Sequence, residues 1–391
     1  MTISTNLILT GRQFNEIYRG NIFVKLTNKL EKHNWYQFRT GLNIDPVGFN
    51  PNGECQPGGF YFCEINKVDM WLNYNYQSMY YFRSVTIPND AQVYTETNKF
   101  KADQFILSER REISELEIWN SPEYCSRAVR QNGLALQYVR SQTIEMCMQA
   151  VKQNGLALQY VIGQYPAICL AAVQQNSDAL KYVQHQTEEI CLEAVKKDGL
   201  ALMYVFNQTA NICLAAVKHN SRALEYVQNQ TREMCLEAVQ PHGLSLQFVK
   251  HQTEEICSIA VEQVAYALQF VKNQTLSMCL NAVSMDGWVL QYVKNQNKAI
   301  CLVAVQQNGG ALQFVKNQKK SICLQAVRQE GHALKYVENQ TEEICLAAVR
   351  QRGESLHWVE HQTLAICRAA VEQNPAAIAY VKPEFKNLLA V

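Results

Sequence analysis

From residue 125 onward the chain repeats itself every 22 residues, and this period constrains the fold more than any other feature. Its clearest marker is a cysteine that returns twelve times at that spacing. These residues are Cys125, Cys147, Cys169, Cys191, Cys213, Cys235, Cys257, Cys279, Cys301, Cys323, Cys345 and Cys367. A period of about 20–50 residues is typical of repeat proteins, whose units are stable only when stacked on their neighbours.

The apolar residues of each repeat follow helical spacing. If the cysteine is position 1, alanine occupies position 4, valine positions 5 and 15, and an aromatic residue position 14 in all twelve copies. Position 12 is leucine or isoleucine. Two apolar stripes result, which predict two antiparallel helices of about 12 and about 8 residues. Thr187 and its equivalents suit the start of the first helix, and Asn374 and its equivalents suit the start of the second. Because Pro375 follows Asn374, the glycine found there in most copies relieves crowding and is not a left-handed cap.

The fold class that follows is an α-solenoid of about 12 repeats over residues 119–391, preceded by a small α+β domain over residues 1–118. Stacked layers of helices lie about 8–10 Å apart, whereas a disulfide needs Cα atoms within about 7 Å. Successive thiols are therefore predicted to be free core residues in a reducing compartment, with no shared metal.

The first 118 residues lack the repeat and are rich in aromatic residues. Alternating patterns predict strands at 59–63, 81–87, 92–95 and 104–107. Residues 14–32 and 67–74 are interpreted as helices, and 41–59 as a long loop ordered against the domain. No catalytic or phosphate-binding motif occurs, so neither a catalytic residue nor a cofactor is predicted.

Charge and hydropathy narrow the functional classes. The chain has 36 basic and 35 acidic side chains and a formal net charge of +1. Such a balance provides no global attraction to nucleic acid or to an anionic membrane. No apolar run reaches the roughly 18 residues that a membrane helix needs, and the start MTISTNLILTGRQF does not resemble a secretory signal. A cytoplasmic protein is expected.

Two polar columns stand out within the repeat. Glutamine fills position 18 in every copy from Gln142 to Gln362, and we interpret it as a side chain that satisfies loose backbone groups between repeats. Position 16 is lysine in four consecutive repeats, and further lysines stand at nearby junctions. The candidate partner-binding residues are Lys250, Lys272, Lys294, Lys316, Lys298, Lys319 and Lys320. They are either a contact for an acidic protein segment or an ordinary solvated face.

The 22-residue unit ICLxAVKQNGxALxYVxNQTEE resembles a helical-repeat family of giant viruses of the mimivirus group and of amoeba-associated bacteria. The segments GLNIDPVGFNPNGECQPGGFYF and IPNDAQVYTETNKFKADQFIL resemble the N-terminal module that precedes ankyrin repeats in mimivirus proteins. The resemblance implies a viral protein that acts in the host cytoplasm and joins one head domain to a repeat array. It carries no catalytic residues over.

The leading functional hypothesis is a non-enzymatic scaffold or adaptor that binds a host or viral protein, with no membrane and no small-molecule substrate. A helical-repeat protein that binds single-stranded RNA is one alternative, although position 13 varies too little for a base code. A second alternative is a structural protein of the virion. A third alternative is an enzyme with an ADP-ribosyltransferase-like head domain.

Overall fold

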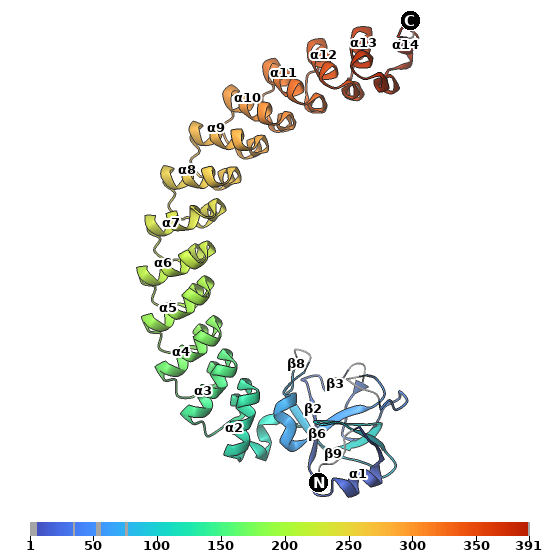
Figure 1. Cartoon of the computed structure of the whole chain (residues 1–391), viewed down its shortest axis with the longest axis vertical. Coiled ribbons are helices and arrows are strands. Elements are labelled where there is room, and N and C mark those ends of the chain that lie inside the picture. The colour runs from blue at the N-terminus through green and yellow to red at the C-terminus, as the bar shows by residue number, and fades with distance from the viewer. Residues whose placement is uncertain (1–5, 34–35, 52–55, 75–76, 390–391) are drawn as a thin grey trace. The chain divides into compact units, whose positions relative to one another are not determined.

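The computed structural model describes residues 6–33, 36–51, 56–74 and 77–389 (Figure 1). An antiparallel sheet domain comes first in the chain, and pairs of short helices follow from residue 122. Backbone contacts divide the chain into two compact units, Met1–Lys197 and Asp198–Val391. The first unit holds the sheet domain with the first repeats, and the second holds repeats only.

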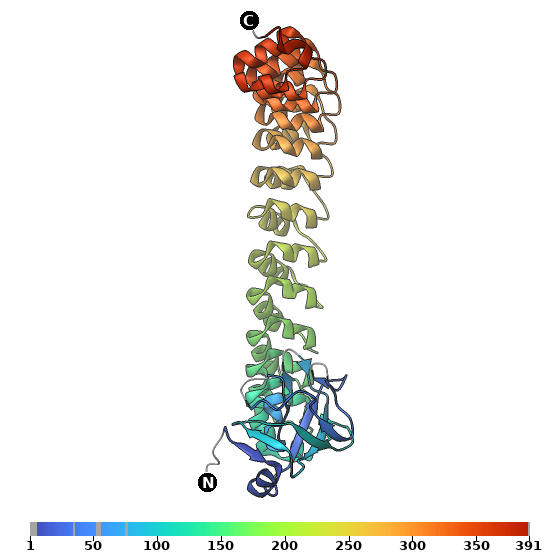
Figure 2. The same cartoon turned by 90° about the vertical axis from the view of Figure 1, so that its right-hand side faces the viewer.

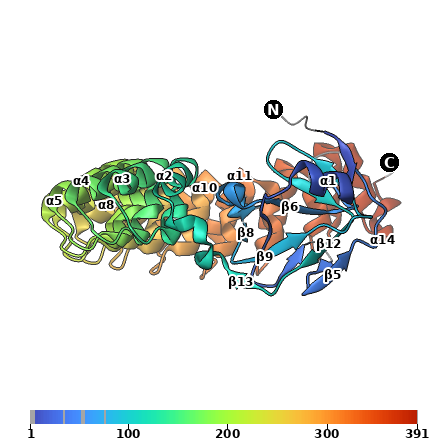
Figure 3. The ribbon, with the colours of Figure 1, turned by 90° about the horizontal axis from the view of Figure 1, so that it is seen from below.

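The sheet has nine strands in the order β1-β10-β11-β6-β2-β9-β12-β5, with β13 also on β9, and every pair is antiparallel. Figure 3 shows this domain with β5, β6, β9, β12 and β13 labelled. The strands are β1 Ile8–Thr10, β2 Phe23–Thr27, β5 Gly41–Ile44, β6 Phe60–Glu64, β9 Tyr81–Thr86, β10 Gln92–Thr95, β11 Phe100–Ala102, β12 Gln104–Leu107 and β13 Arg111–Glu112. Two small hairpins pair β3 Lys32–His33 with β4 Tyr36–Gln37 and β7 Asn73–Tyr74 with β8 Gln77–Ser78.

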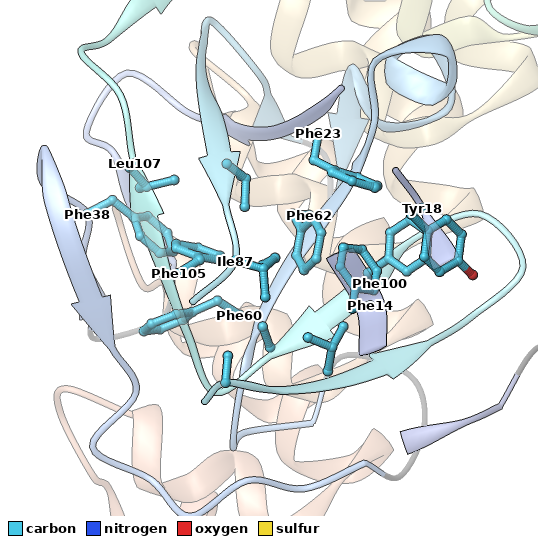
Figure 4. Packing of buried hydrophobic residues seen from close by; sticks show 14 residues of the cluster. Phe14, Tyr18, Phe23, Phe38, Phe60, Phe62, Ile87, Phe100, Phe105 and Leu107 are labelled. Carbon is cyan, nitrogen blue, oxygen red and sulfur yellow. The ribbon is translucent and has the colours of Figure 1, made fainter. Parts of the chain in front are cut away.

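Aromatic rings fill the core of the sheet domain (Figure 4). Phe14 is fully buried on helix α1 (Gly11–Ile17), and its ring lies 5.0 Å from that of Phe23 and 5.2 Å from that of Phe100. Phe60 and Phe105 form a second group, 5.2 Å apart. The Phe14–Phe100 pair is edge-to-face and the other two pairs are tilted, and aromatic pairs in such arrangements stabilise a core beyond their buried area. The aromatic enrichment of the sequence is thus accounted for by packing.

All four strands predicted for this domain are confirmed as β6, β9, β10 and β12. The helix predicted over 14–32 is wrong beyond Ile17, because Phe23–Thr27 is the central strand β2, which pairs with both β6 and β9. Gly20, at a φ of 91°, turns the chain between the two elements. Pairing with distant strands here overrides local helical pattern. The helix predicted over 67–74 is also corrected, to a 3₁₀-helix η1 (Ile65–Trp71) followed by β7.

The stretch 41–59 begins as strand β5 and then becomes the predicted ordered loop, of which residues 52–55 lie outside the described residues. Lys101 is fully buried beneath it, and its ammonium donates to the carbonyls of Asn50 at 2.7 Å and Gln56 at 2.9 Å. Asp45 accepts the amide N–H of Gly59 at 2.7 Å. These bonds satisfy the buried charge and hold the loop against the sheet.

Each repeat consists of an α-helix followed by a 3₁₀-helix. The α-helices are α2 Pro122–Gln131, α3 Ile144–Gln153, α4 Pro166–Gln175, α5 Glu188–Lys197, α6 Ala210–His219, α7 Arg232–Val239, α8 Glu254–Gln263, α9 Leu276–Met285, α10 Lys298–Gln307, α11 Lys320–Gln329, α12 Glu342–Gln351 and α13 Leu364–Gln373. The 3₁₀-helices are η4 Gly133–Tyr138, η5 Gly155–Tyr160, η6 Ser177–Tyr182, η7 Gly199–Tyr204, η8 Ser221–Tyr226, η9 Gly243–Phe248, η10 Ala265–Phe270, η11 Gly287–Tyr292, η12 Gly309–Phe314, η13 Gly331–Tyr336, η14 Gly353–Trp358 and η15 Pro375–Tyr380. A short helix α14 (Pro383–Lys386) ends the array.

The repeat architecture is confirmed, with one correction to the second helix. It has six residues in 3₁₀ form, where an α-helix of about eight was expected. A six-residue helix forms very few i→i−4 bonds, so the tighter i→i−3 pattern costs little and ends cleanly at position 15. In η11, for example, the N–H of Val293 donates to the carbonyl of Leu290 at 3.1 Å.

The predicted start of the second helix is confirmed. The Asn308 side chain accepts the N–H of Gly310 at 2.9 Å, and Asn374 accepts that of Ala376 at 3.0 Å. The glycine that follows is not left-handed. A Cβ placed on Gly287 would lie 2.4 Å from the carbonyl oxygen of Ala304 in the next repeat. Glycine therefore relieves crowding between repeats, as the sequence predicts.

The sheet domain covers the first face of the array through buried contacts. Tyr124 on α2 donates its hydroxyl to the carboxylate of Asp69 at 3.1 Å and accepts the Asp69 N–H at 3.2 Å. Burial and this carboxylate raise the pKa of Tyr124, which keeps the phenol protonated as a donor. Arg127 donates to the carbonyl of Asn66 at 2.6 Å. The predicted boundary at residue 118 falls inside η3 (Glu117–Asn120), beside the buried Trp119.

Candidate interaction surface

The residues that are constant among the repeats pack in the core of the array or form hydrogen bonds between repeats. The position-1 cysteines are buried, with Cys191 and Cys345 each 3% exposed, and the described cysteines form no disulfide. Burial raises the pKa of both thiols to about 11, and nearby glutamates add to the effect. A neutral thiol is a weak nucleophile, so these residues act as the small apolar core residues that were predicted.

The glutamine column joins each repeat to the next one. Gln274 illustrates it: its Nε2 donates to the carbonyls of Tyr292 at 2.8 Å and Leu268 at 3.1 Å, while its Oε1 accepts the N–H of Lys294 at 2.9 Å. The thiol of Cys279 donates to the same oxygen. One side chain thus satisfies backbone groups of two successive repeats. The interpretation as an internal backbone partner is confirmed, and the column is not free to hold a peptide.

The position-16 lysines form a ladder along the segments that connect the repeats. Lys294 donates from Nζ to the carbonyl oxygen of Lys272 at 2.7 Å, and Lys316 donates to that of Lys294 at 3.1 Å. Lys272 donates to the carbonyl of Lys250 at 3.0 Å. Each ammonium is therefore held over the preceding connection, and within residues 198–391 these connections run along one edge (Figure 2).

The charge of this edge changes sign along the array. The connecting segments 271–277, 293–299 and 315–321 contain six lysines and no acidic residue. We call their lysines the basic edge. They are Lys272, Lys294, Lys298, Lys316, Lys319 and Lys320, and all six side chains are exposed.

Acidic residues bound the basic edge on both sides. The preceding connection carries Glu254 and Glu255, and the following one carries Glu338, Glu342 and Glu343. The pKa values of the nearby buried thiols respond to this change of sign. Burial raises the pKa of Cys257, and the charge of Lys272 partly offsets that rise. Burial also raises the pKa of Cys323, and there the charge of Glu338 adds to the rise.

Ion pairs link neighbouring connections at the two boundaries. Lys320 pairs with Glu343, and Arg232 pairs with Glu255, in each case between position 20 of one repeat and position 21 of the next. Both pairs are exposed, so each contributes little to stability. Lys298 has no such acidic partner, because the next connection places Ser321 where Glu343 or Glu255 would stand.

A shallow cavity of about 430 Å³ opens at the start of this edge. Lys250, Lys272 and Asn273 line it together with Thr253 at the start of α8. Its wall also includes Glu254, so the cavity itself carries mixed charge. It is a recess between two connections.

The structure brings the seven predicted partner-binding residues to one edge but assigns them different local roles. The four position-16 lysines form the ladder. Lys298 is the first residue of α10, and Lys319 and Lys320 stand at the start of α11. Lys250 belongs to the neighbouring connection that also holds Glu254 and Glu255. Sequence reasoning missed the carbonyl contacts of the lysines, whose only signal was their 22-residue spacing.

Among residues 6–33, 36–51, 56–74 and 77–389, no helix is long and apolar enough to cross a membrane. The same residues include no cluster of three or more histidine, cysteine, aspartate or glutamate side chains placed to hold a metal ion.

Comparison with known proteins finds a domain of unknown function within the repeats, and relatives of parts of the chain among mimivirus proteins. Residues 121–162 and 187–230 match a domain of unknown function (DUF4116). The chain is 27% identical over 113 residues to the uncharacterized protein R869 of Acanthamoeba polyphaga mimivirus, a match that covers 28% of this chain and 82% of that protein. It is 30% identical over 107 residues to the protein of the same virus named "Putative ankyrin repeat protein R868", covering 26% of this chain and 51% of the relative. No solved structure matches the chain.

Proposed function

We propose that the chain is a non-enzymatic scaffold whose repeat array binds a host or viral protein through its exposed edge. One observation carries the proposal, namely the division of each repeat into constant interior positions and variable exposed ones. Positions 1, 4, 5, 12, 15 and 18 are spent on packing and on bonds between repeats. Positions 6 and 16 face solvent in the described repeats and differ among them. Repeat arrays commonly use such extended surfaces to bind partners.

The sheet domain supports this role by closing one end of the array. A stacked array needs its terminal apolar faces covered to stay in solution. The contacts of Tyr124 with Asp69, and of Arg127 with Asn66, cover the first repeat with polar, specific bonds. The remaining surface of the array is then available along its length.

Cross-linking tests the proposal on the full chain. A photoreactive residue replaces the exposed Asn295 in one sample and the exposed Lys218 in another. Each sample is incubated with Acanthamoeba lysate, with and without nuclease treatment, and irradiated. We expect one or a few proteins to be cross-linked reproducibly, with contacts mapped to variable exposed positions. If only nuclease-sensitive material is recovered, or no protein is enriched over an unrelated repeat protein, the scaffold proposal is wrong.

A further inference from the structure

We propose that the basic edge binds an extended acidic segment of a partner protein, with a carboxylate at every third residue. The inference rests on the proposed scaffold function and specifies its site and the chemistry of its partner. It is carried by the charge, the fixed geometry and the spacing of the lysines.

The basic edge concentrates positive charge in one part of a chain that is nearly neutral overall. Six exposed lysines occupy three successive connections that hold no acidic side chain. Helices α9, α10 and α11, which start here, also lack the acidic first turn found in α8 and α12. The partial positive charge of the helix starts therefore adds to that of the lysines. The result favours an anionic partner along three repeats.

The ladder holds its ammonium groups in place before any partner binds. Lys294 uses two of its three N–H donors on the carbonyls of Val271 and Lys272, and Lys316 uses one on the carbonyl of Lys294. Each retains a donor for a carboxylate, because an ammonium has three. Ordering a flexible side chain on binding costs about 0.5–1.5 kcal/mol. Much of that cost is already met in the free protein.

The spacing of the ladder fits an extended peptide in steps of three residues. Neighbouring helical layers lie about 8–10 Å apart. A polyproline II segment has three residues per turn and advances about 9 Å per turn. Acidic side chains at i, i+3 and i+6 therefore face the same side, each opposite one of Lys272, Lys294 and Lys316. The cavity beside Lys272 lies where the next turn of such a segment would run.

The same charges disfavour nucleic acid as the partner. A nucleic acid carries phosphates continuously, so a strand that follows the edge would run from the lysines onto Glu338, Glu342 and Glu343 on one side. On the other side it would meet Glu254 and Glu255. Only the few contacts between these boundaries would be favourable, whereas nucleic-acid affinity grows with the number of phosphates neutralised. A short acidic segment matches the length of the edge.

Three synthetic peptides test the spacing on the full chain. Each carries four glutamates and a fluorescent label, with the glutamates separated by one, two or three prolines, and binding is followed by fluorescence anisotropy. We expect the peptide with two prolines between glutamates to bind at least about tenfold tighter than the others, because only it aligns three ion pairs. If the three peptides bind with equal affinity, the edge attracts negative charge without regard to its spacing, and the inference is wrong. Tighter binding of a single-stranded RNA oligonucleotide of the same charge would overturn it in favour of nucleic acid.

Matched variants test the residues. The edge variant combines Lys272→Gln, Lys294→Gln and Lys316→Gln, a change that the fold accommodates because Gln184 and Gln228 occupy position 16 in other repeats. Its expected loss of peptide affinity is about tenfold.

The control variant combines Lys152→Gln, Lys196→Gln and Lys218→Gln, which removes the same charge from exposed α-helix positions. It is expected to bind within about twofold of the natural chain, and an equal loss in both variants contradicts the inference. Failure here is distinct from failure of the scaffold proposal. If the edge variant keeps every cross-linked lysate protein, the scaffold stands and the acidic-segment site is wrong. If the peptide binds as expected while no lysate protein is cross-linked, the scaffold proposal alone falls.

Discussion

Replacing Gln274 with methionine keeps the length of the side chain and removes the amide that joins two repeats. Three main-chain bonds are lost, to the carbonyls of Leu268 and Tyr292 and from the N–H of Lys294. Each such bond is worth about 0.5–1.5 kcal/mol net. Gln274 is only half-buried, so water can replace some of the lost hydrogen bonds. We therefore expect the free energy of local unfolding to fall by about 2 kcal/mol.

Native-state hydrogen exchange measures this loss where it occurs. The N–H of Lys294 loses its acceptor in the variant, so its exchange should become roughly 30-fold faster, because about 1.4 kcal/mol corresponds to a factor of ten. In a repeat array each repeat is stabilised by its neighbours. The variant should therefore also lower the protection of amides in α9 and η11, and lower it more there than in the distant helix α12.

Gln269→Met is the matched control. This glutamine is exposed and makes one described bond, from Nε2 to the carbonyl of Tyr266 at 2.9 Å. The expected change is within about 0.5 kcal/mol. If Gln274→Met and Gln269→Met change protection equally, or if the Lys294 amide exchanges as before, the glutamine column does not couple the repeats.

Three further perturbations follow from the packing. Tyr124→Phe leaves the buried carboxylate of Asp69 without its hydroxyl donor, so the full chain should lose about 1–3 kcal/mol in denaturant unfolding; an unchanged midpoint contradicts a bonded junction. Gly287→Ala forces a Cβ against the carbonyl of Ala304 and should destabilise by about 1–3 kcal/mol in the same assay, whereas crowding that relaxes freely would leave the midpoint unchanged. Burial raises the folded pKa of thiols such as that of Cys345 to about 11, above the ordinary value of 9.0, so stability should fall as pH rises from 9 to 11. Comparison of unfolding midpoints at pH 8 and pH 10.5 checks this, and a higher midpoint at pH 10.5 contradicts it.

Local chemistry in the sequence predicted much of the array. The helix positions follow from apolar spacing, which is a property of neighbouring turns. The start of the second helix follows from Asn374, because an asparagine cap acts on a residue two positions away. Even the role of glycine could be predicted, since Pro375 in the same position excludes a left-handed backbone.

The sequence was a poor guide wherever the deciding contact lies far along the chain. Phe23–Thr27 has a pattern that suits a helix, yet it is a strand because β6 and β9 pair with it. In the same way, the grouping of Lys272, Lys294 and Lys316 depends on carbonyl groups of the preceding connection, 22 residues away.

The sequence by itself determined the period of the array, because the same residues return every 22 positions. It also determined the buried positions and the caps of the helices, because these depend on residues a few positions apart. Only the tertiary structure decided the 3₁₀ form of the second helix, the partners of Gln274 and the alignment of the basic edge. These depend on how one repeat sits against the next. Stacking sets the distance and register between layers. Which backbone carbonyl then lies within reach of a side chain cannot be predicted from the residue types alone.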